Sequence, residues 1–126
     1  MDANYALEAK ERWGQTPAFQ ESQKRLKNYS KDDIALATKE LELATQKVLE
    51  AFKGKLAPTS VEAMEGAEAH RLSISNWWYS CDYQMHQNLG DMYLADPRFK
   101  ENYENLKIGF AQYLRDAIYA NAALNG

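Results

Sequence analysis

A chain of 126 residues with 45% apolar and 26% charged residues has the size and composition of one soluble domain that can bury its own core. Its net charge is −3 and no basic stripe is present, which argues against direct nucleic-acid binding, and no apolar run approaches the roughly 18–20 residues that cross a membrane. A lone cysteine cannot form an internal disulfide and the first residues do not resemble a secretion signal, so we expect a cytoplasmic protein.

The first thirty residues predict two short helices, of which the second has little apolar surface to bury. The spacing predicts one helix from Asp2 to about Trp13, and the Thr16-Pro17 pair, a cap followed by proline, starts a second. The second helix has only two large apolar side chains, so it is expected to be weakly held. We therefore expect a single domain over residues 1–126, with residues 1–30 as a mobile arm and residues 31–126 as the core.

A long helix is predicted next. Ser30 is a good N-cap, and Asp33 in the first turn favours the helix dipole. Apolar residues then recur at helical spacing as far as Phe52, and Gly54 is the expected end of the helix.

A further helix is predicted to begin at Thr59 or Ser60, with Glu62 placed as the capping-box partner of Thr59. This helix leads into the segment from His70 to Asp96. This segment holds both histidines, the only cysteine and two of the three tryptophans. One apolar stripe runs along it and predicts either one helix or two helices in near register. The stripe consists of Ile74, Trp78, Cys81, Met85, Leu89 and Met92.

A final helix is predicted to begin at the Asp96-Pro97 pair and to run to about Ala123, with a break near Asn102 as the alternative. Its apolar residues recur at steps of four and three from Phe99 onward. No segment shows the period-two alternation of a strand. The sequence therefore predicts an all-α fold.

Cys81 faces either a packed core or a pocket, and the two interpretations imply different chemistry. A free cysteine is commonly a small buried hydrophobe. A reactive thiolate needs a cation or a helix N-terminus nearby. The neighbour here is Asp82, and no Lys or Arg lies between Arg71 and Arg98. A reactive Cys81 is therefore expected to act through its proximity to a bound electrophile.

Neither histidine is placed to serve Cys81 as a general base. On a continuous helix His86 is turned about 140° from Cys81, and His70 lies about 16 Å away along the axis. Asp82 and His86, four residues apart, are expected to form a surface hydrogen bond and not a metal site. We expect no enzyme, no metal and no cofactor. The alternative with a cofactor is a globin-like sensor that binds haem through His70 or His86. Such a protein would show the Soret absorption band of haem.

Adjacent aromatic side chains cover most of the helix circumference around Cys81. Such a helix is either fully buried or lines a cleft with its extra aromatic rings, and flat aromatic walls suit a planar, heterocyclic ligand. The residues concerned are Trp77, Trp78, Tyr79 and Tyr83.

Three segments carry a resemblance to a known family. They are RWG-x-T-x-A-F-x-x-S-x at Arg12–Gln23, EAHRLSISNWWYSCDYQMHQNLGDMYLADPRF at Glu68–Phe99 and YLRDAIYANAA at Tyr113–Ala123. Together they resemble the TipA-type antibiotic-recognition domain, the effector part of thiostrepton-induced activators in the MerR family of transcription regulators. The resemblance spans nearly the whole chain, with a looser middle.

The resemblance implies a globin-like all-α fold without haem and the binding of thiopeptide or related antibiotics in a cleft between an N-terminal part and the core. In the founding member of that family, a cysteine in the matching motif adds covalently to a dehydroalanine of the antibiotic, which makes Cys81 the candidate attachment site. The full regulators of this family have an N-terminal DNA-binding domain, and we do not expect one within these 126 residues. The chain is expected to act as the ligand-sensing effector domain or as a stand-alone form that sequesters the drug.

The leading hypothesis is an antibiotic-binding module that has no membrane partner and reaches DNA only through another domain. The alternative is a protein-interaction module that holds a partner helix in the same cleft. The residues expected to line the cleft are Trp13, Phe19, His70, Trp77, Trp78, Cys81, Tyr83 and Met85.

Overall fold

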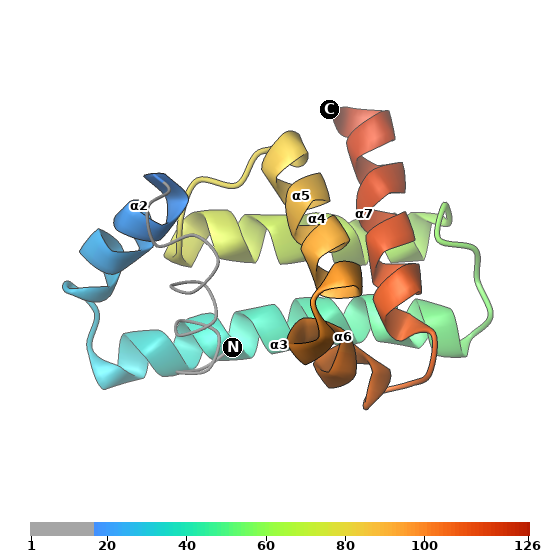
Figure 1. Ribbon diagram of the computed structural model, residues 1–126, viewed down its shortest axis with the longest axis horizontal. Helices are drawn as coiled ribbons and strands as arrows, with labels where there is room; N and C mark the ends of the chain where they lie inside the picture. Colours follow the sequence, from blue (N-terminus) through green and yellow to red (C-terminus); the bar gives the residue numbers. More distant parts are fainter. Residues whose placement is uncertain (1–16) are drawn as a thin grey trace.

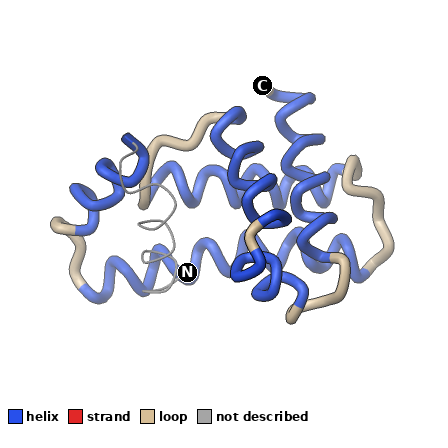
Figure 2. Tube along the Cα trace, viewed as in Figure 1, coloured by secondary structure: helices blue, strands red, loops and turns tan. Residues whose placement is uncertain are grey.

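The computed structural model describes residues 17–126, apart from the side chains of Ala18 and Phe19. Within this range the chain forms six helices and no strand, which confirms the all-α prediction (Figure 2). None of these helices is both long and apolar enough to span a membrane. The helices are α2 (Pro17–Leu26), α3 (Lys31–Lys53), α4 (Val61–Trp77), α5 (Tyr83–Ala95), α6 (Pro97–Glu104) and α7 (Phe110–Asn125).

The helices form two crossed pairs. α3 and α4 lie side by side, and α5 and α7 lie side by side across them (Figure 1). The short α6 follows α5 and packs against both α5 and α7, whereas α2 lies near the α4–α5 connection (Figure 1). The predicted helix before Gly14 lies outside the described residues, as does Trp13. The described part of the predicted arm, residues 17–30, includes α2.

Local capping explains where most helices begin. Ser30 and Asp33 form a reciprocal capping box at the start of α3, and Gly54 ends that helix, as predicted. α4 is capped by Ser60, whose hydroxyl accepts the backbone N–H of Ala63, so the capping box expected between Thr59 and Glu62 is wrong.

The His70–Asp96 segment forms two helices, since the chain leaves helical geometry between Trp78 and Asp82. The apolar stripe continues through this connection because Trp78 and Cys81 are buried even though they are not helical. The carboxylate of Asp82 then accepts the backbone N–H of Met85 and restarts the helix as α5.

The long C-terminal helix predicted from Asp96-Pro97 to Ala123 is also divided. The break between α6 and α7, residues 105–109, begins close to Asn102, where the alternative prediction placed it. Gly109 there has φ 92°, a left-handed conformation that favours glycine. Because glycine has no capping side chain, the carboxylate of Glu104 accepts the backbone N–H groups of Gly109 and Ala111 instead.

The core lies between the two helix pairs and consists of aromatic and aliphatic side chains. Gly66 allows α4 to approach α3 closely, because a Cβ atom there would lie 2.8 Å from Cγ2 of Val48. The largest fully buried apolar side chains are Tyr79, Tyr93, Phe110, Ile74, Leu89, Leu114 and Ile118.

Candidate functional site

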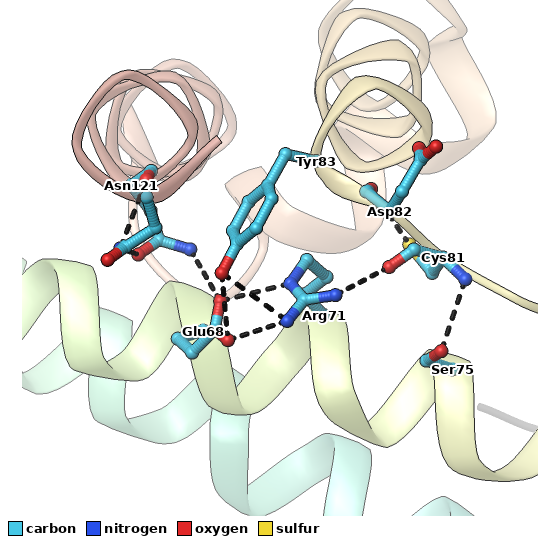
Figure 3. A network of polar contacts seen from close by, with 8 residues as sticks. Glu68, Arg71, Ser75, Cys81, Asp82, Tyr83 and Asn121 are labelled. Carbon is cyan, nitrogen blue, oxygen red and sulfur yellow. Dashed lines mark hydrogen bonds and ion pairs between the residues drawn. The ribbon is translucent and has the colours of Figure 1, made fainter.

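The connection between α4 and α5, residues 78–82, is held at Cys81 by two hydrogen bonds to α4 (Figure 3). The backbone N–H of Cys81 donates to the hydroxyl of Ser75 at 3.2 Å, and its carbonyl accepts from Nη1 of Arg71 at 2.8 Å. We call these residues, 78–82, the Cys81 loop. The residue that the sequence singled out is therefore fixed through its backbone.

Arg71 is part of a polar network that joins α4, α5 and α7 (Figure 3). Its guanidinium donates to both carboxylate oxygens of Glu68, at 3.0 and 2.6 Å, and lies 4.2 Å from the ring centre of Tyr83. The same carboxylate accepts the hydroxyl of Tyr83 at 3.2 Å and Nδ2 of Asn121 at 2.9 Å. These donors, first of all Arg71, lower the pKa of Glu68, so the carboxylate stays charged.

The Cys81 loop and the end of α4 also contact α2 and Tyr29, which lies in the connection between α2 and α3. The carboxylate of Glu21 accepts the backbone N–H of Ser80 at 3.3 Å and forms an ion pair with Arg25. Arg25 also donates to the carbonyl of Ser75 at 2.6 Å. The hydroxyl of Tyr29 donates to the carbonyl of Trp77 at 2.6 Å, and the two rings meet edge to face.

The thiol of Cys81 is protected and has little nucleophilic character in this conformation. The residue is 2% exposed, and burial, assisted by the carboxylates of Asp82 and Glu68, raises the pKa of the thiol to about 12. Arg71 opposes this shift but does not cancel it. The thiol's hydrogen-bond acceptor is the carbonyl of Asp82, 3.8 Å away. Any reaction of Cys81 therefore requires the loop to move.

The two histidines bond to each other and not to the thiol. Nδ1 of His70 lies 2.9 Å from Nε2 of His86, and both side chains are fully buried. Burial lowers the pKa of each imidazole, so both are neutral at pH 7. The expected surface hydrogen bond between Asp82 and His86 is wrong, because Asp82 caps α5 and His86 points into the core.

The other residues predicted for the site are distributed between the core and the surface. Trp77 is partly exposed, and its indole Nε1 donates to Glu40 of α3 at 2.7 Å. Trp78 is buried, while Met85 is partly buried against the core. The side chains of Trp13 and Phe19 lie outside what the structure describes. The residues of this cluster meet in two places: Ser80 contacts α2 and Trp77 contacts Tyr29 after it, whereas Cys81 and Tyr83 contact Arg71 of α4. His70 lies in the core.

The sequence reasoning missed three contributors to this cluster: Glu21, Glu68 and Arg71. The spacing of Glu68 and Arg71 by three residues on a helix was a visible signal of an ion pair. Their connection to Asn121, 53 positions along the chain, depends on how α4 packs against α7 and leaves no trace in local spacing.

A groove lies between α3 and α4, where Leu43 and Leu72 are more than two-fifths exposed, and it borders Trp77 because Glu40, one of its lining residues, accepts the indole N–H of Trp77. It contains none of the residues predicted to bind a ligand; its lining residues are Glu40, Leu43, Ala44, Lys47, Ala69, Leu72, Ser73 and Asn76. Among residues 17–126, no three His, Cys, Asp or Glu side chains gather in a way that would hold a metal ion.

Known proteins resemble this chain over most of its length. The HTH-type transcriptional activators TipA of Streptomyces coelicolor and of Streptomyces lividans are each 39% identical to it over 118 residues, which is 94% of this chain and 47% of theirs. The HTH-type transcriptional activator mta of Bacillus subtilis is 30% identical over 90% of this chain and 43% of its own length. The chain thus spans about half the length of the curated relatives it matches.

Two solved structures share the fold. TipAS of Streptomyces lividans in complex with nosiheptide, from a thiopeptide antibiotic resistance system, matches with a TM-score of 0.85 at 38% identity, covering 98% of this chain and 87% of that one. The antibiotic-binding domain of a TipA-class multidrug resistance regulator matches with a TM-score of 0.64 at 39% identity, over 70% of this chain and 94% of that one. The model of the TipAS antibiotic-recognition domain matches residues 5–121. This chain therefore belongs to the TipAS antibiotic-recognition domain family, with its globin-like helical fold.

Proposed function

We propose that this domain binds thiopeptide antibiotics and that it does so where α2 meets Trp77 and the Cys81 loop. The observation that carries the proposal is the likeness, over 98% of the chain, to a TipAS structure in complex with nosiheptide. In this proposal the domain is the ligand-sensing part of a MerR-family activator, and DNA is bound by a different part of such a regulator. The domain binds its ligand without catalytic turnover.

The surface near α2 has the chemistry that a large heterocyclic peptide needs. Trp77 and Tyr29 offer partly exposed aromatic rings in edge-to-face contact, which can stack against thiazole-type rings. Glu21 and Ser80 lie beside them and provide a carboxylate and a hydroxyl for polar contacts. An apolar surface with a few oriented polar groups is typical of ligand sites in proteins. Trp13 and Phe19 are proposed to complete this surface.

The contacts of α2 support a site that rearranges when the ligand enters. α2 reaches the Cys81 loop and the end of α4 through polar groups that are mostly partly exposed, such as Glu21 and Arg25. Partly exposed contacts of this kind contribute little net stability each, so a ligand can displace them at modest cost. We propose that α2 exchanges these contacts for contacts with the bound antibiotic.

Covalent capture through Cys81 is a separable part of the proposal. The sulfur would add to the methylene carbon of a dehydroalanine, the carbon–carbon π bond would break, and the thiol proton would end on the α-carbon. Because burial raises the pKa of this thiol to about 12, the addition requires the Cys81 loop to open first. Intact mass after incubation with nosiheptide tests it: an increase of one ligand mass supports capture, and an unchanged mass with binding retained in Cys81→Ala leaves the cysteine a packing role.

A titration of tryptophan fluorescence with nosiheptide tests the proposed function. Saturable quenching at one ligand per chain is expected, and Trp77→Phe should remove a large part of the signal while the protein still binds. Vancomycin, a peptide antibiotic without thiazole rings, is the control and should leave the fluorescence unchanged. A folded protein whose fluorescence and calorimetric titration both stay flat with nosiheptide would contradict the proposal.

A further inference from the structure

Arg71 holds three groups that come from different parts of the chain. Its guanidinium forms a two-pronged pair with Glu68 on α4, donates to the carbonyl of Cys81 at 2.8 Å, and stacks 4.2 Å from the ring centre of Tyr83 at the start of α5. Figure 3 shows the guanidinium between Glu68 and Tyr83 on one side and the Cys81 carbonyl on the other. It therefore connects α4 to the end of the Cys81 loop and to the start of α5.

The position of the guanidinium is itself fixed from α7. Glu68 accepts Nδ2 of Asn121, and Asn121 is held in turn by Nδ2 of Asn125 at 2.9 Å. The side chain of Arg71 is only 14% exposed, so these charge-assisted bonds are weakly screened by water. The carbonyl of Cys81 is thus held by a chain of contacts that leads through Arg71 and Glu68 to α7.

Lysine could not make the same set of contacts. The planar guanidinium has five N–H groups in a rigid fork, which permits two bonds to Glu68 and one to Cys81 while a face lies on the Tyr83 ring. A lysine ammonium is a compact charge with three donors and no stacking face. The requirement here is geometric, and charge alone does not meet it.

We propose that Arg71 is the positioning residue of the Cys81 loop: by holding the Cys81 carbonyl and the Tyr83 ring together, it keeps the loop closed over the thiol and in the shape that an incoming antibiotic meets. The part of this inference that concerns the antibiotic rests on the proposed function. The part that concerns the loop does not, because the exposure of a thiol can be measured without any ligand.

The chain provides a matched control at Arg115. Cζ of Arg115 also lies 4.2 Å from a tyrosine ring centre, that of Tyr119, and Nε donates to Asp91 at 3.0 Å. This second cluster joins α5 to α7 at the surface and makes no contact with the Cys81 loop. Substitutions at Arg115 therefore remove the same kinds of interaction and leave the contacts of Arg71 with the Cys81 loop intact.

The experiment measures how fast 5,5′-dithiobis(2-nitrobenzoate) reacts with Cys81, the chain's only cysteine, in the folded protein. We expect Arg71→Gln to raise the rate roughly tenfold or more, the scale of losing one charge-assisted hydrogen bond. Arg71→Lys should fall between the Gln variant and the wild type, and Arg115→Gln should react at the wild-type rate. Rates in low urea separate loop opening, which depends weakly on urea, from global unfolding, which depends strongly on it.

The second measurement is the dissociation constant for nosiheptide, which Arg71→Gln should raise roughly tenfold or more relative to Arg115→Gln. If the wild-type chain binds no nosiheptide while the thiol rates change as expected, the proposed function fails and the loop inference stands. Equal thiol rates in Arg71→Gln and Arg115→Gln would overturn the inference. So would a rate increase that follows global unfolding in its urea dependence, or an Arg71→Lys variant identical to the wild type.

Discussion

The buried pair of His70 and His86 leads to a prediction about stability in acid. The two imidazoles share a hydrogen bond of 2.9 Å and are fully buried. Protonation of either neutral ring would therefore place a positive charge in the core. Burial accordingly lowers the pKa of both side chains below the value of about 6.5 that an exposed histidine has. The folded protein therefore resists protonation at this pair.

The sign of the effect follows from which state binds more protons. Below pH 6.5 the unfolded chain takes up a proton on each histidine, whereas the folded chain does not, so the free energy of unfolding decreases as the pH falls. For His70, whose pKa is lowered to about 4, the loss between pH 7.5 and pH 5 is about 2 kcal/mol. Burial lowers the pKa of His86 as well, so protonation of the unfolded chain at His86 adds to this loss, which is a large part of the typical stability of a domain. The loss levels off below the pKa values of the folded state.

Urea unfolding followed by tryptophan fluorescence at pH 7.5, 6.0 and 5.0 measures this loss. The histidines are the only side chains whose ordinary pKa lies inside that window, and the chain has two of them. The control is the double variant His70→Leu, His86→Leu, which removes both partners and leaves neither nitrogen unpaired. Its stability should change little between pH 7.5 and 5. Equal pH dependence in the two proteins would refute the reasoning, because it would mean that the pair accepts protons without unfolding.

Three further predictions test the packing, the caps and the thiol. Gly66→Ala should lower the free energy of unfolding by about 1–3 kcal/mol, because the new Cβ would lie 2.8 Å from Val48, and a lower urea midpoint would show it; an unchanged midpoint would mean that α3 and α4 separate freely. Glu104→Ala should lower the free energy of unfolding by about 1 kcal/mol, because it removes the cap of α7, and the thermal midpoint should fall. An unchanged midpoint would mean that water bonds the N–H groups of Gly109 and Ala111 equally well. At pH 8 iodoacetamide should alkylate Cys81 roughly a hundredfold more slowly in the folded protein than in urea, since its pKa is raised to about 12; equal rates would show that the loop is open.

The beginnings of helices were predictable because capping is local. Ser30 with Asp33, and Asp96 before Pro97, place their acceptors within three residues of the N–H groups they cap, so the sequence alone shows them. The two breaks were harder to predict. The apolar stripe continues through Trp78 and Cys81 because a connection that packs on the core needs apolar side chains as much as a helix does. Asp82, the cap of α5, was the signal that was overlooked.

The candidate site was predictable only in part. The aromatic residues around Cys81 are adjacent in sequence, so their clustering could be predicted from the sequence alone. The group that fixes the loop, Arg71, acts through Glu68 and Asn121, and those contacts depend on the packing of α4 against α7. The bond between the histidines depends on the turn between α4 and α5, since on one continuous helix the two rings would lie apart.

The central claim is that nosiheptide binds where α2 meets the Cys81 loop, and the most direct test is a ¹H–¹⁵N correlation spectrum during titration. The chain has three tryptophans, so its indole signals are few and easily assigned. We predict that the indole signal of Trp77 and the amide signals of Ser80 and Cys81 shift or broaden, while the amides of Leu43 and Leu72 in the α3–α4 groove remain in place. Shifts confined to Leu43 and Leu72, or a spectrum unchanged at excess nosiheptide, would contradict the claim.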